Sequence, residues 1–73
     1  MDKQDRITIN PAIRFGKPSI RGSRFTVSDI LEYLASGMTW DEILDDFPYL
    51  ERDDIPAALM YAAESMKKRE ISE

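Results

Sequence analysis

Carboxylates are the side chains with the most chemical potential in this sequence of 73 residues, because the chain contains neither histidine nor cysteine. They occur as adjacent pairs: Asp41–Glu42, Asp45–Asp46 and Asp53–Asp54. Neighbours on a helix point about 100° apart, so such a pair does not converge on one substrate atom or one metal ion. The commonest general base and the strongest nucleophile are also missing. The sequence therefore predicts that the protein is not an enzyme and holds no metal ion or other cofactor.

Basic side chains gather in the glycine-containing stretch GKPSIRGSRFTV, residues 16–27. Lys17, Arg21 and Arg24 have the donors to bind phosphates or carboxylates. The pattern GxxxxGK[ST] of nucleotide-binding loops is not present. Two interpretations remain open: a hairpin whose basic side chains lie in water, or a surface that binds an anionic partner.

A short β-element is expected to position these basic residues. Residues 6–9 alternate polar and apolar side chains, which is typical of a strand. Residues 19–20 and 24–27 flank Gly22, and a glycine permits the positive φ that a tight hairpin requires. The basic stretch is therefore predicted to form a hairpin ahead of the helices.

Helical periodicity and start signals then predict three helices, near residues 27–36, 39–47 and 53–68. Thr26 with Asp29, and Thr39 with Glu42, have the spacing of a capping box, in which each side chain satisfies a free backbone donor. Gly37 is placed to end the first helix in the left-handed conformation. The buried stripe of the second helix is expected to comprise Trp40, Ile43, Leu44 and Phe47.

The expected fold class is mainly α, with a small N-terminal β-element and a trihelical, homeodomain-like helix-turn-helix core whose helices are joined by turns of about three to four residues. One domain accounts for the whole chain: a basic hairpin or turn segment (1–26), the helical core (27–69) and a frayed tail (70–73). No apolar run approaches the roughly 20 residues of a membrane span. A cytoplasmic protein without a membrane partner is expected.

The net charge of −4 is unevenly distributed along the chain. The balance is +4 over residues 1–24, −9 over residues 25–66 and +1 over residues 67–73. Segregated charge steers association with partners of opposite charge. A DNA-binding role would use the basic residues Lys17, Arg21, Arg24 and Arg52. A basic protein partner would instead meet the acidic start of the third helix, with Asp53, Asp54 and the nearby Tyr61.

Three segments, GKPSIRGSRFTV, ILEYLASGMTWDEILDDFPYL and DDIPAALMYAAE, resemble a widespread bacterial and archaeal helix-turn-helix family formerly classed as a domain of unknown function. Phe15 stands where that family often has a second glycine, Ser23 replaces a threonine, and Glu51 replaces the usual capping threonine. Many members are regarded as VapB-like antitoxins that sit beside PIN-like nuclease toxins. The resemblance implies an antitoxin that silences a PIN-like ribonuclease and binds its own operator DNA as a homodimer.

Two functions from different classes are therefore predicted. The first is the antitoxin of a type II toxin–antitoxin pair, with autoregulation through DNA. The alternative is a protein-binding adaptor on the same scaffold with no DNA role, because fold does not settle function. Salt-dependent binding to the protein's own upstream DNA separates the two.

Overall fold

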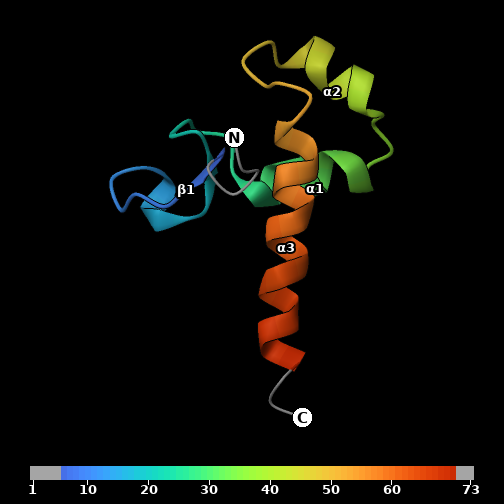
Figure 1. Ribbon diagram of the computed structural model, residues 1–73. Helices are drawn as coiled ribbons and strands as arrows, with labels where there is room; N and C mark the ends of the chain where they lie inside the picture. Colours follow the sequence, from blue (N-terminus) through green and yellow to red (C-terminus); the bar gives the residue numbers. More distant parts are fainter. Residues whose placement is uncertain (1–5, 71–73) are drawn as a thin grey trace.

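The computed structural model describes residues 6–70 (Figure 1). Its elements are, in chain order, β1 (Ile7–Thr8), the 3-10 turn η2 (Arg14–Gly16), β2 (Ser19–Ile20), α1 (Val27–Ala35), α2 (Trp40–Asp46) and α3 (Asp54–Glu70). The predicted mainly α fold, with a small N-terminal β-element and three helices, is confirmed. Most of the expected frayed tail lies outside the described residues, and α3 continues to Glu70.

The β-element differs from the expected hairpin in its pairing. β2 forms its antiparallel ladder with β1, where Ile20 lies opposite Ile7, and only an isolated bridge joins Ser19 to Thr26. The tight turn itself is present: Arg21 and Gly22 have φ of 49° and 74°, and the Ser23 amide donates to the Ile20 carbonyl at 2.9 Å. The second arm cannot continue as a strand because α1 begins directly after the bridge.

Both predicted capping boxes are confirmed, and they fix where α1 and α2 begin. The Thr26 hydroxyl accepts from the Asp29 amide at 3.0 Å, while the Asp29 carboxylate accepts from the Thr26 amide at 3.1 Å. Thr39 and Glu42 repeat this exchange at 3.1 and 2.8 Å. Gly37, with φ of 102°, ends α1 as expected.

The connection between α2 and α3 is longer than the predicted turn, since it spans residues 47–53. Pro48 prevents α2 from continuing. The Leu50 amide donates to the Phe47 carbonyl at 2.9 Å, which folds this segment into a compact turn and places Leu50 in the core. The third helix, predicted to start near residue 53, begins at Asp54.

The core lies where α1, the first turns of α3, the β-element and α2 meet. Its buried cluster comprises Ile20, Val27, Ile30, Ile43, Leu50, Ile55 and Ala58. Trp40 is only partly buried beside this cluster, less than its place on the apolar stripe predicts, whereas Ile43 is fully buried.

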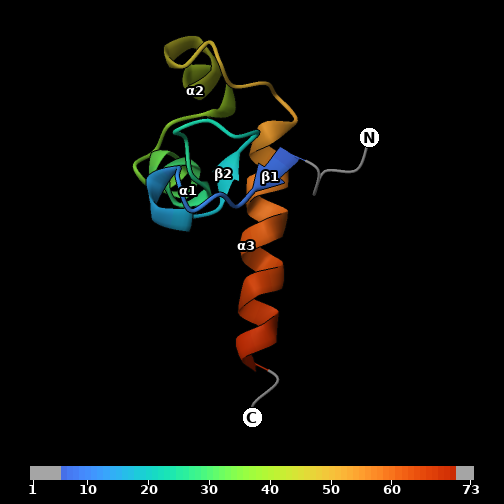
Figure 2. The same cartoon turned by 90° about the vertical axis from the view of Figure 1, so that its left-hand side faces the viewer.

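The three helices are not packed side by side along their lengths. In Figures 1 and 2 α1 crosses the upper part of α3, α2 lies beyond the first turn of α3, and the C-terminal half of α3 extends away from the other elements. None of the helices in the described part of the chain is both long and apolar enough to cross a membrane.

Candidate functional site

A buried carboxylate, Asp54, joins the basic β-element to the start of α3. Its side chain has no exposed surface. Arg21 binds it through two donors, Nε to Oδ1 at 3.2 Å and Nη2 to Oδ2 at 2.9 Å, and Arg6 adds Nη1 to Oδ1 at 2.9 Å. The Glu51 amide donates to Oδ2 at 2.7 Å. Four hydrogen bonds from three residues thus compensate the burial of one negative charge.

Arg21 is held on its other side by Tyr49. The guanidinium carbon of Arg21 lies 4.6 Å from the centre of the Tyr49 ring, and Arg21 Nη2 donates to the Tyr49 carbonyl at 2.9 Å. The Tyr49 hydroxyl donates in return to the Arg21 carbonyl at 3.1 Å. These contacts fix both the side chain and the left-handed backbone of Arg21.

The electrostatics of this cluster favour its ionised form. Burial raises the pKa of Asp54, but hydrogen bonds from Arg21, the Glu51 amide and Arg6 outweigh it and leave that pKa below its ordinary value. The pKa of Arg6 is raised chiefly by its hydrogen bond to Glu51, and the pKa of Arg21 by its hydrogen bond to Asp54. The cluster therefore acts as a structural clamp between strand and helix.

This geometry changes the interpretation of three predicted site residues. Asp54 is inside the fold, so it presents no surface to a protein partner. The Arg21 guanidinium donates hydrogen bonds to Asp54 and to the Tyr49 carbonyl and does not point its donors toward solvent. Tyr61 is half-buried and packs against the core, although it was expected to contact a partner.

The remaining predicted site residues are exposed. Arg52 forms an ion pair with Asp41, and Asp53 makes only a 3.8 Å contact with Arg6. Lys17 and Arg24 enter no ion pair with any residue that the structure describes. The structure does not gather the four predicted DNA-binding residues into one basic patch, because two of them are paired with acids.

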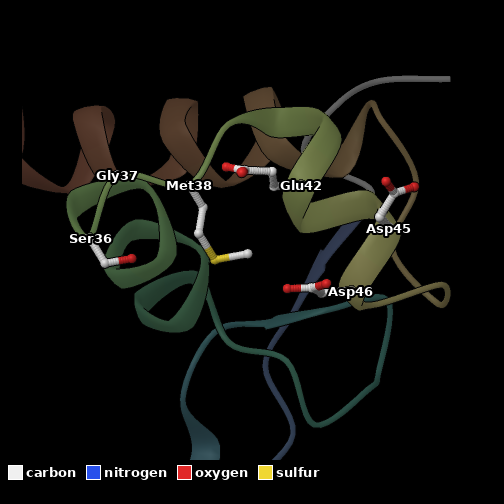
Figure 3. A pocket seen from close by; sticks show the side chains of 6 residues that line it. All are labelled: Ser36, Gly37, Met38, Glu42, Asp45 and Asp46. Carbon is white, nitrogen blue, oxygen red and sulfur yellow. The ribbon is translucent and has the colours of Figure 1, made fainter.

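A second acidic surface lies on α2, and sequence reasoning had assigned it only to solvent. A hollow of about 390 Å³ is lined by Ser36, Gly37, Met38, Glu42, Asp45 and Asp46. Figure 3 shows the Met38 side chain between α1 and α2, with the carboxylates of Glu42 and Asp46 turned toward the same space and Asp45 at its outer edge. We call these six residues the acidic hollow.

The negative potential of the acidic hollow comes from its carboxylates and from the C-terminal ends of the two helices that border it. It lies at the C-terminal end of α1, where the helix dipole adds partial negative charge, although the carbonyls of residues 32–34 accept hydrogen bonds from residues 36–38. Asp45 and Asp46 occupy the last turn of α2, and neither helix has a basic residue in its last turn. Acids in that position oppose the helix dipole, so the arrangement costs the isolated domain a few tenths of a kcal/mol. The signal was visible in the sequence as two aspartates just before the helix-ending proline.

The acidic hollow is suited to a cationic side chain. A lysine or arginine stem can pack on Met38 while its charged head meets the carboxylates. Among residues 6–70, no group of three or more His, Cys, Asp or Glu side chains is placed to hold a metal ion.

The β-element also carries an exposed aromatic residue that sequence reasoning did not single out as a site. Phe15 is 97% exposed and has φ of 59°. Its neighbour Arg14 is also left-handed, with φ of 50°, and is tied to the Arg24 carbonyl at 2.9 Å and to Asp29 at 3.5 Å. The loop thus presents a ring to solvent beside the unpaired cations Lys17 and Arg24.

These features define a small, mainly helical domain in which Arg6 and Arg21 of the N-terminal segment form ion pairs with Asp54 at the start of α3. Residues 7–62 match the family model described as "Protein of unknown function (DUF433)". The match covers most of the chain, and the protein belongs to the DUF433 family.

A solved structure supports the same assignment. The chain is similar to a DUF433 member protein from Anabaena variabilis, with 30% sequence identity and a TM-score of 0.80. The alignment covers 96% of this chain and 71% of that one. A search of curated proteins finds no match. The comparisons thus confirm the predicted membership of a family described as of unknown function. The antitoxin and DNA-binding roles that the resemblance implies stay predictions.

Proposed function

We propose that the protein is an antitoxin that binds and neutralises a basic nuclease of the PIN-like class in the cytoplasm. The observation that carries this proposal is the acidic hollow and the exposed acids beside it on α2. A ribonuclease needs a basic surface to hold RNA, and a carboxylate-lined surface is complementary to it. The family resemblance supplies the class of partner.

The internal pairing of the arginines supports a protein partner over DNA as the main target. Arg6 and Arg21 are bound to Asp54 and neighbouring acids, and Arg14 is bound to Asp29. These cations therefore add little to a surface for phosphates. Among the described residues, Asp45 and Asp46 enter no ion pair, whereas Asp41 pairs with Arg52 and the Glu42 carboxylate accepts from the Thr39 amide.

The experiment measures association with the product of the adjacent gene. Asp45→Asn with Asp46→Asn removes two carboxylates from the hollow and relieves their conflict with the helix dipole, so the fold is retained. We expect the affinity to fall about two- to thirtyfold at low ionic strength, since each exposed pair contributes about 0.2–1 kcal/mol. The difference should shrink as salt screens the charges.

A matched control separates local from overall charge. Glu32→Gln with Glu64→Gln causes the same change in net charge at exposed residues of α1 and α3 that do not line the hollow, and should leave the affinity nearly unchanged. If both double variants weaken binding equally, the partner senses only net charge and the acidic hollow is not the interface. If the adjacent gene product does not co-purify with the wild-type protein, the antitoxin proposal fails.

A further inference from the structure

The outer face of α3 is apolar but is not covered within the described fold. Leu59, Met60 and Met66 are 37%, 46% and 61% exposed, and Ala63 lies between them. Figures 1 and 2 both show the C-terminal half of α3 standing clear of the other elements. A helical segment without tertiary contacts is marginal in water, so a covering surface would stabilise it.

A negative charge lies at one end of this apolar face and a positive charge at the other, at equal distances along the sequence from Met60. Asp53, Met60 and Lys67 are seven residues apart, and each step of seven falls only about 20° short of two full turns. Met60 and Lys67 therefore lie along one line of α3, and Asp53, the residue directly before the helix, stands at its N-terminal end, about 21 Å from Lys67 at 1.5 Å per residue. Ala63 is small enough for another helix to approach closely beside this line.

The two end charges are available for pairing. The Asp53 side chain is 71% exposed, and its contact with Arg6 measures 3.8 Å. Lys67 is exposed and enters no ion pair with any described residue. The face thus has an acid at one end, a cation at the other and apolar side chains between them. Two copies of this face are complementary when their helices run antiparallel.

We propose that α3 pairs with α3 of a second copy of the chain in an antiparallel, two-fold dimer centred on Met60. Asp53 of each copy then lies opposite Lys67 of the other, and the two Met60 side chains meet on the axis. Such an isologous contact forms each ion pair twice. A parallel arrangement would place like charges together and align the helix dipoles, so it is disfavoured. This inference does not depend on the proposed nuclease partner.

Charge exchange tests the pairing by sedimentation velocity over a range of protein concentrations. We expect the wild-type protein to form a dimer and both Asp53→Lys and Lys67→Asp to weaken it about tenfold or more, because each replacement turns two attractions into two repulsions. The double variant carrying both changes should recover most of the affinity, because it restores opposite charges across the axis.

The recovery distinguishes an interface from an effect within one chain. Each replacement opposes the α3 dipole, so a purely intramolecular effect would be greatest in the double variant. Met60→Arg, at an exposed position, provides a second test: it places two cations on the axis and should give a folded monomer. A wild-type protein that stays monomeric up to its solubility limit overturns the proposal, as does a dimer unaffected by the single charge changes.

Discussion

Two left-handed residues of the β-element, Arg21 and Phe15, differ in what holds their backbone. Arg21, with φ of 49°, is fixed by Asp54 and Tyr49. Phe15, with φ of 59°, has a side chain that is 97% exposed. A non-glycine residue in this region costs about 1–2 kcal/mol, and at Phe15 no burial of the ring offsets it. The resembling family often has glycine at this position, which accords with that strain.

We expect Phe15→Gly to leave the domain equally stable or more stable by up to about 1 kcal/mol. Glycine relieves the backbone strain, while its greater freedom in the unfolded chain offsets about 0.4–1 kcal/mol. Phe15→Ala keeps the strain and removes only the exposed ring, so it should change stability by less than about 0.5 kcal/mol. Urea unfolding measures both variants. A loss above 1 kcal/mol in each would mean that the ring packs against the fold.

At the scale of elements, the sequence predicted where the helices lie but not the contacts that join α3 to the β-element. Local signals, such as Thr39 with Glu42, identify helix starts because both partners lie within one turn. The clamp on Asp54 joins residues 33 and 48 positions apart, so no local pattern specifies it. The sequence contains one local signal of this clamp: Asp54 lies three residues after Glu51. At that spacing the Asp54 carboxylate accepts a hydrogen bond from the Glu51 amide, at 2.7 Å.

Asp54→Asn should destabilise the domain by about 3–5 kcal/mol at neutral pH, because it breaks a buried ion pair and leaves Arg6 and Arg21 facing a neutral amide. A domain of this size is stable by roughly 4–11 kcal/mol, so the loss is large. Chemical denaturation measures it. Asp53→Asn is the matched control at the neighbouring exposed carboxylate, since asparagine is as good a residue as aspartate before a helix. Measured at a protein concentration at which the chain is monomeric, it should change stability by less than about 0.5 kcal/mol.

The same substitution should alter the acid limb of stability. The pKa of Asp54 is lower in the folded state than its usual unfolded value of about 3.9. Its contribution is therefore complete above that value and is lost as the pH falls through the folded pKa. Wild type should lose stability faster than Asp54→Asn below about pH 4, so that the two curves converge. Parallel curves would show that Asp54 is not ionised in the fold.

At the scale of the whole molecule, the basic and acidic segments of the sequence neutralise each other in part. Arg6 and Arg21 from the basic segment meet Glu51 and Asp54 from the acidic one. Composition predicts segregated charge but cannot say whether the segments lie apart or in contact. Among the described residues, the exposed charges that remain for partners include the acids of the hollow on α2, the cations Lys17 and Arg24 of the N-terminal segment, and the cation Lys67 in the last turns of α3.

This distribution limits what any DNA interaction can look like. Lys17 and Arg24 are the cations of the basic N-terminal segment that enter no ion pair with a described residue. If they alone contact phosphates, the logarithm of the binding constant for the protein's own promoter fragment should fall with the logarithm of salt concentration by about 2 per chain. Lys17→Ala with Arg24→Ala should abolish most of that dependence. A slope near 5 would mean that further cations contact phosphates: either Arg6, Arg14 and Arg21 leave their internal partners, or the basic end of α3 joins the DNA interface. If the wild-type protein shifts no promoter fragment even at low salt, the operator role is wrong, and recognition rests on the protein partner alone.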